Sequence, residues 1–158
     1  MKFLELNDNG IGTIKLPFIF RDKLSDPISN IMNISIEDTT NEAFFINLLK
    51  ATIDAVKHVP DTERNYTEFD TTNGELCRLK ILNRYITIDF YNDFKAIDLI
   101  CSLSVPLNLR PFVKNLLDDY KELAESGLLK SFTKEDREYM RIINKYYQEL
   151  YDLYKVTF

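Results

Sequence analysis

The chain has 158 residues, with 20 basic side chains against 25 acidic ones and a formal net charge of −5 at pH 7. Domains usually contain about 100–200 residues, so the length predicts a single globular domain over residues 1–158. An apolar content of 45% and a charged content of 28% are ordinary for a soluble protein. They exclude a disordered chain, a collagen-like chain and a disulfide scaffold.

Compartment signals come from the first residues and from the cysteines. Acid and amide side chains within the first eight residues interrupt any signal-peptide core. The longest charge-free stretch, Leu99–Leu109, is far shorter than the roughly 20 residues of a membrane helix. Cys77 and Cys101 form no CxxC pair, which favours free thiols in a reducing compartment. We therefore expect a cytoplasmic protein with no membrane association.

The first part of the chain is rich in β-forming residues. Met1–Leu6 and Ile11–Phe20 flank the turn sequence Asn7–Gly10, which predicts a hairpin. Pro17 lies inside the second run and predicts an edge or a bulge there, because proline donates no backbone hydrogen bond. Further along, only Asn33–Glu37 alternates clearly, and we expect a strand over those residues.

A helix is predicted to begin at Thr39, which has capping-box spacing to Glu42. Pro60 cannot continue the helix, so His58 is expected in its last turn, where a partial positive charge favours the helix dipole. Apolar residues fall on one face at helical spacing: Phe45, Leu49, Ile53 and Val56.

The hydrophobic period then changes from 3.6 to 2. In the run Tyr85–Tyr91, the apolar residues Ile86, Ile88 and Phe90 share one side. Short turn signals separate the runs, which predicts an antiparallel meander with one face on a core. The four runs are Asn65–Thr71, Glu75–Leu82, Tyr85–Tyr91 and Lys95–Val105. In the fourth, Ile97, Leu99, Cys101 and Leu103 alternate with Ala96, Asp98, Ile100 and Ser102.

Two helices are predicted to close the chain. Asn108 can cap one that runs to about Ser126, with Pro111 tolerated in its first turn and Gly127 ending it. Thr133 can cap the other. The predicted fold class is therefore α+β, an antiparallel β-meander packed against three main helices, two of them C-terminal.

Negative charge is concentrated in the first half of the chain. Residues 1–79 carry 8 basic and 13 acidic side chains, and the excess is sharpest between Glu37 and Glu75. Acidic surfaces repel phosphate backbones, which argues against nucleic-acid binding. They suit a basic protein partner, because opposite potentials steer association. The alternative is that these charges serve solubility alone.

Catalytic, metal and cofactor motifs are scarce. His58 is the only histidine, and no serine or cysteine stands in a nucleophile turn. One histidine and two scattered cysteines are too few for a zinc site, and no Gly-rich phosphate loop occurs. Asp89 and Asp98 on neighbouring strands remain as a possible Mg²⁺ or acid–base pair. We favour a protein that is not an enzyme and holds no metal or cofactor.

The last helix carries more aromatic surface than one core-facing side needs. Tyrosine is enriched at interfaces because a rigid apolar ring carries a polar tip. Its apolar residues form two stripes, and the second of these predicts either a surface for a partner or for a homodimer, or additional core packing. One stripe contains Tyr139, Ile143, Tyr146, Leu150 and Leu153, and the other contains Met140, Tyr147, Tyr151 and Tyr154.

In its size, acidity and lack of catalytic motifs, the chain resembles the small bacterial immunity proteins that neutralise contact-dependent or polymorphic toxins. The resemblance implies tight, non-enzymatic binding of a basic toxin domain, such as a nuclease. On that basis the predicted partner-binding residues are Asp61, Glu63, Tyr66, Glu68 and Asp70. A phage or mobile-element inhibitor of a host defence complex would share these features. A homo-oligomeric structural protein would instead use Tyr147, Tyr151 and Tyr154.

Overall fold

The computed structural model describes residues 4–6, 12–20, 28–36, 41–70, 76–82, 84–92, 98–126 and 136–158. Side-chain surroundings are described from Phe44 onward, apart from those of Asp70, Leu103, Asp136 and Arg137. In chain order the elements are β1 (Leu4–Leu6), β2 (Gly12–Phe20), β3 (Ile28–Ile36), α1 (Asn41–Val56), the 3₁₀ turn η1 (Asp61–Glu63), β4 (Thr67–Asp70), β5 (Leu76–Ile81), β6 (Tyr85–Tyr91), β7 (Leu99–Pro106), α2 (Leu109–Ser126) and α3 (Asp136–Thr157).

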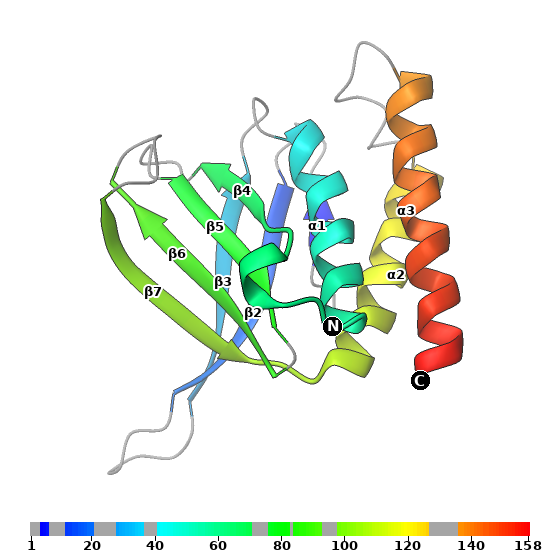
Figure 1. Ribbon diagram of the computed structural model, residues 1–158. Helices are drawn as coiled ribbons and strands as arrows, with labels where there is room; N and C mark the ends of the chain where they lie inside the picture. The colour runs from blue at the N-terminus through cyan, green and yellow to red at the C-terminus, as the bar shows by residue number, and fades with distance from the viewer. Residues whose placement is uncertain are drawn as a thin grey trace.

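The strands form two antiparallel sheets, one in the order β1-β2-β3 and one in the order β4-β5-β6-β7. Figure 1 shows the helices gathered on the β4 side of the second sheet, with β7 at its far edge and β2 and β3 behind it. The two sheets approach each other where β2 lies near β7 and β3 lies near β4. The predicted α+β class, a meander packed against three helices of which two are C-terminal, is confirmed.

The N-terminal sheet agrees with the predicted hairpin and corrects the third strand. β1 pairs with β2, Leu4 opposite Ile14. β1 reaches no further than Ile14, so Pro17 lies where β2 pairs with β3 alone, opposite Ile31. β3 is longer than predicted and begins at Ile28, because continuous pairing with β2 overrides its irregular alternation. The turn at Asn7–Gly10 and the predicted cap Thr39 lie outside the described residues.

Helix α1 is buried almost all round, rather than along one predicted face. It packs between β4 and α3, so Phe44 and Leu48 are buried together with Phe45 and Leu49. The hydroxyl of Thr52 donates to the carbonyl oxygen of Leu48 at 2.8 Å, which satisfies this buried polar group within the helix. A wide apolar surface on α1 thus joins the sheet to the C-terminal helix.

His58 lies beyond the end of α1, so the prediction that places it in the last turn is wrong. Its φ is 57°, in the left-handed region usually taken by glycine after a helix. The N–H of Val59 donates to the carbonyl oxygen of Asp54 at 3.0 Å, and the N–H of His58 donates to that of Ala55 at 3.3 Å. These two bonds form a Schellman motif, which reverses the chain toward η1.

The inner face of the β4–β7 sheet forms the core with α1 and α2. Phe44 packs edge-on against Phe45 and Phe69, with ring centroids 5.4 Å and 5.9 Å away. Tyr120 of α2 is fully buried and donates its hydroxyl hydrogen to the carbonyl oxygen of Phe45. The inner face of the sheet is supplied by residues that include Thr67, Phe69, Cys77, Leu79, Ile81, Ile86, Ile88 and Val105, all buried.

Strand β7 departs from the predicted alternation. The register shifts between Phe90 and Tyr91, so that Phe90 faces Cys101, Tyr91 faces Leu99, and Ile100 has no partner residue. Leu99, Ile100 and Cys101 are all exposed, whereas Val105 near the other end is buried. The prediction of one core-facing side therefore fails over the first half of β7, because a bulge lies there at the sheet edge.

The C-terminal helices follow the predicted pattern. α2 starts directly after Asn108, as expected, and ends at Ser126. The first stripe of α3 faces the core, with Tyr139, Ile143 and Leu150 buried. Gly127 and Thr133 lie outside the described residues. Among the helices that the structure describes, none is long and apolar enough to cross a membrane.

Candidate interaction surface

The outer face of the β4–β7 sheet carries polar and aromatic side chains at half-exposed or exposed positions. Cross-strand register places Glu68, Arg78, Asp89 and Ser102 in one row across all four strands. Figure 1 shows η1 in front of the sheet, near β4 and β5. The same sheet therefore has one apolar face that forms the core and one face whose polar and aromatic side chains, where described, are partly or largely exposed.

Arg78 is the centre of a cluster on this face. Its guanidinium carbon lies 4.6 Å from the ring centroid of Tyr66 and 5.3 Å from that of Tyr91. Its Nε donates to a carboxylate oxygen of Glu68 at 2.9 Å. Burial lowers the pKa of Arg78, but the hydrogen bond to Glu68 and the nearby tyrosines outweigh it and raise that pKa above its usual value. The guanidinium is thus charged and held by three side chains.

The five predicted partner-binding residues occupy different surroundings. Asp61 and Glu63 are exposed in η1, and Tyr66 is 37% exposed just before β4. Glu68 is paired with Arg78, so its carboxylate already has a basic partner within the chain. Asp70 pairs with Leu76 in the sheet, but its side chain lies outside the described part of the chain. The structure thus brings Tyr66 and Glu68 together around a basic residue.

One further acid of this part of the chain, Asp54, has a structural role, as has the nearby base Arg64. Asp54 accepts hydrogen bonds from the backbone N–H and the side-chain amide of Asn65, at 2.7 Å and 2.6 Å. Arg64 donates from Nε to the carbonyl oxygen of Val59 at 3.1 Å and from Nη1 to that of Ile81 at 2.8 Å. These bonds hold the segment around η1 against α1 and β5. Fewer carboxylates of this segment are therefore available to a basic partner than the count of acidic residues in the sequence predicts.

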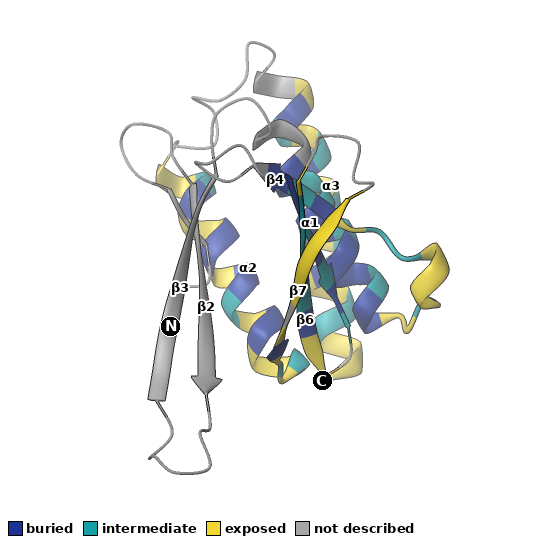
Figure 2. Cartoon of the chain, turned by 90° about the vertical axis from the view of Figure 1, so that its left-hand side faces the viewer, coloured by how far each residue is buried: buried dark blue, intermediate teal, exposed yellow. Residues whose placement is uncertain are grey.

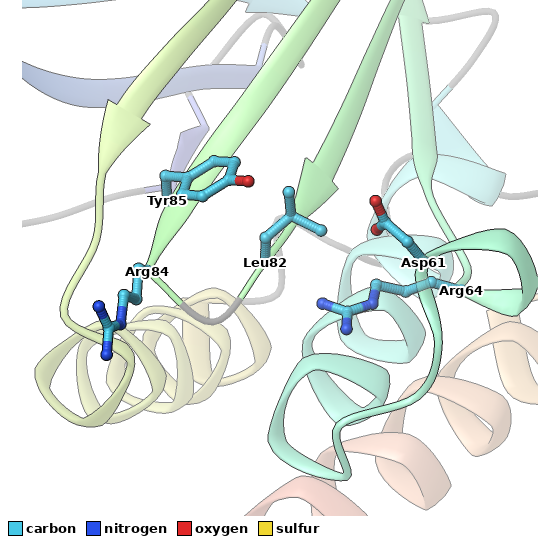
Figure 3. Close-up of a pocket in the computed structure, with 5 residues that line it drawn as sticks. All are labelled: Asp61, Arg64, Leu82, Arg84 and Tyr85. Atoms are coloured by element: carbon cyan, nitrogen blue, oxygen red, sulfur yellow. The ribbon is translucent and has the colours of Figure 1, made fainter.

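An open depression of about 350 Å³ lies between η1 and the start of β6. Figure 3 shows Arg64 directed toward Leu82, while the guanidinium of Arg84 turns away from the other side chains. Arg64 is held by backbone carbonyls and Arg84 points elsewhere, so the two cations do not converge on one ligand position. The depression extends the outer face toward η1. Its lining residues are Asp61, Arg64, Leu82, Arg84 and Tyr85.

The proposed carboxylate pair of Asp89 and Asp98 is wrong. Asp89 lies opposite Ser102, whose hydroxyl donates to its carboxylate at 2.6 Å. Asp98 precedes β7 beyond the bulge, where its carbonyl oxygen accepts the N–H of Asn92 at 2.9 Å. The strand register thus separates the two carboxylates along the sheet. Across the described residues, no three His, Cys, Asp or Glu side chains gather where they could hold a metal ion.

The tyrosines of α3 form the second predicted surface. The rings of Tyr147 and Tyr151 are nearly parallel, with centroids 6.4 Å apart, and the ammonium of Lys155 lies 4.3 Å from the Tyr151 centroid. Tyr147 and Tyr154 are partly buried against the core, whereas Tyr151 is exposed. Partial burial, with smaller effects of Asp118, Tyr151 and Glu125, raises the pKa of Tyr147. This stripe therefore serves core packing at least in part.

Sequence reasoning missed Arg78 and Tyr91 as members of the surface. A signal for the first was present, because a hairpin turning about Asn73 places position 68 opposite position 78, as the structure does. The position of Tyr91 near Arg78 depends on the register of β5 and β6. That register pairs Asp89 with Arg78 and places Tyr91 two residues further along β6, opposite Leu76. The positions of both residues depend on which strand residues pair, and a count of charges along the sequence carries no information on strand pairing.

Comparison of the chain with protein-family models, with curated proteins and with solved structures found no match. The assignment of a function therefore depends on the residues and the geometry described above.

Proposed function

We propose that this protein is a non-enzymatic binding protein that neutralises a cognate toxin domain, and that it binds through η1 and the outer face of the β4–β7 sheet. The observation that carries the proposal is the cluster of Tyr66, Arg78 and Tyr91 on a sheet face that the described helices leave open. Tyrosine and arginine dominate the residues that contribute most to protein–protein binding.

The cluster suits tight binding because its members are ordered in advance. Contacts with the rings of Tyr66 and Tyr91 and the bond to Glu68 restrain the long Arg78 side chain before any partner arrives. Restraint of this kind lowers the conformational entropy lost on association. A sheet face with a central aromatic and arginine anchor also suits the surface around an active site of a folded domain.

The exposed carboxylates of Asp61 and Glu63 supply the charge complementarity of the proposal. Both stand in η1, at the border of the outer face, beside the depression that Leu82 and Tyr85 help to line. Lys and Arg side chains of a nuclease toxin would meet them there, while an apolar side chain would enter the depression. We place this encounter in the cytoplasm, where the free thiols of Cys77 and Cys101 stay reduced.

The test begins with purification of the tagged protein from cells that also express the candidate toxin domain. A stoichiometric basic partner, identified by mass spectrometry, then serves in calorimetric titration. We expect Asp61→Lys with Glu63→Lys to weaken binding at least about tenfold, and Tyr66→Ala with Arg78→Ala to weaken it more than about 30-fold.

A matched control reverses two exposed acids elsewhere. Asp118→Lys on α2 and Asp152→Lys on α3 change the net charge equally but lie outside the proposed surface. Equal losses in both double variants would contradict the location of the surface, and unchanged affinity in every variant would refute it. Recovery of a host defence subunit instead of a toxin would support the inhibitor alternative.

A further inference from the structure

Two basic side chains stand next to each other on the outer face of β5. Arg78 and Lys80 are both half-buried, and they alternate with buried residues that face the core. Residues two apart on a strand share a face and lie about 7 Å apart, so the two positive charges are neighbours. Strand register continues the row from Lys80 to Thr87 and Ser104. Figure 2 looks onto β7, the exposed edge at which this row ends.

The described carboxylates of this sheet face are already engaged. Glu68 accepts a hydrogen bond from Arg78, and Asp89 accepts one from the hydroxyl of Ser102 at 2.6 Å. Within the described residues, Arg78 uses only Nε for its bond with Glu68, and Lys80 forms no ion pair. The N–H groups of Nη1 and Nη2 and the ammonium of Lys80 are therefore donors to which no described side chain supplies an acceptor.

We propose that Arg78 and Lys80 together bind a carboxylate of the toxin domain, so that the partner presents an acidic side chain to β5 as well as basic ones to η1. The inference rests on the proposed function, whose binding surface it divides into two parts of opposite charge. Nη1 and Nη2 form a planar fork that matches the two oxygens of a carboxylate, and Lys80 adds a second positive charge beside it. A bound anion also offsets the repulsion between the two cations.

A protein carboxylate fits this place better than a nucleic-acid phosphate. Asp61 and Glu63 are exposed in η1, which Figure 1 shows in front of the sheet near β4 and β5. A nucleic-acid strand carries repeated phosphates and would bring further negative charge toward those two acids. A folded domain can instead place one acid against β5 and basic side chains against η1, and this alternation of charge fixes the orientation of the partner.

Calorimetric titration with the toxin domain recovered by co-purification tests the charge of the contact. Lys80→Glu should weaken binding at least about tenfold, and Lys80→Gln should weaken it less, because the first variant adds repulsion to the loss of a positive charge. Lys121→Glu is the matched control. It makes the same charge change at an exposed site on α2 and should leave the affinity unchanged. Far-ultraviolet circular dichroism checks that each variant folds.

A zero-length carbodiimide cross-link identifies the acid of the partner. The reagent joins an amine to a carboxylate as an amide and takes up the water that is lost. It should link Lys80 to an Asp or Glu of the bound toxin domain, and mass spectrometry of the linked peptides locates both residues. Lys80→Arg keeps the positive charge but has no amine, so the link should disappear. Reversal of the linked acid to lysine should restore affinity toward Lys80→Glu.

The outcomes separate this inference from the function on which it rests. A complex that weakens in Asp61→Lys with Glu63→Lys but not in Lys80→Glu, and gives no link at Lys80, overturns the acidic contact and leaves the neutralising role in place. Binding of a short single-stranded oligonucleotide that is lost in Lys80→Glu would assign the two cations to phosphate instead, against the inference. Recovery of no toxin domain would count against both.

Discussion

Arg78 and Leu79 are neighbours in β5, yet they belong to opposite regions of the molecule. Leu79 faces α1 and α2 and is completely buried, while the Arg78 side chain is 26% exposed between two tyrosines. The inner face contributes hydrophobic burial, which dominates the free energy of folding. The outer face contributes cation–π contacts and the ion pair of Arg78 with Glu68, and partly exposed interactions of this kind add little to stability in water. Substitutions on the outer face are therefore expected to lower the free energy of unfolding less than substitutions on the inner face.

The strongest test of this difference replaces Leu79 with alanine. We expect the free energy of unfolding to fall by about 2–5 kcal/mol, because the change removes buried methyl groups and leaves a cavity in a packed core. Urea denaturation measures the effect. Arg78→Ala, one residue away on the other face, should lower it by less than about 1 kcal/mol. Losses of similar size in the two variants would remove the distinction between the faces.

The next effect concerns the buried hydroxyl of Tyr120. Its hydrogen bond to the carbonyl oxygen of Phe45 joins α2 to α1 inside the core. Tyr120→Phe should lower the free energy of unfolding by about 1–2 kcal/mol, since a buried acceptor loses a donor. Tyr85→Phe is the matched control, because Tyr85 is exposed on the outer face, and it should change stability little. The reverse ranking in urea denaturation would contradict the assignment of the two environments.

Alkaline pH should destabilise the folded protein through the buried hydroxyl of Tyr120. Burial first, and Tyr139 second, raise the pKa of Tyr120 well above the usual value near 10. The folded protein therefore keeps this proton at pH values where the unfolded chain releases it. Stability is full below about pH 10 and falls above it, by up to about 1.4 kcal/mol per pH unit for this group. Urea titrations from about pH 9 to about pH 11 should show a shallower fall for Tyr120→Phe.

The inner face was predictable from the sequence, because burial produces a periodic pattern. Ile86 and Ile88 alternate at period 2 in β6, and the structure buries both. Tyr139, Ile143 and Leu150 repeat at helical spacing in α3 and are buried as well. The prediction fails where another interaction interrupts the period. The bulge at Ile100 does so in β7, and the Schellman motif at His58 ends α1 before its predicted last turn.

The outer face was predictable only in part, because its side chains are selected by neighbours across strands. Glu68 counts as an acid in the sequence but lies 2.9 Å from Arg78 in the structure. Asp54 also counts as an acid, yet it is used to hold Asn65. A count of charged residues does not reveal which carboxylates are paired within the folded chain. Asp61 and Glu63 keep their predicted exposure because the short turn η1 places them outside any ladder.

The smallest expected effect is the coupling between Glu68 and Arg78. Both side chains are partly exposed, 37% and 26%, so solvent screens their attraction. A double-mutant cycle with Glu68→Gln and Arg78→Met should give a coupling of about 0.2–1 kcal/mol in urea denaturation. Binding of the proposed partner should weaken far more in Arg78→Met than this value implies, because the stacked guanidinium is lost at the centre of the surface. A folding coupling above about 2 kcal/mol would show that the outer face holds the fold together, and Arg78 would then be a structural residue.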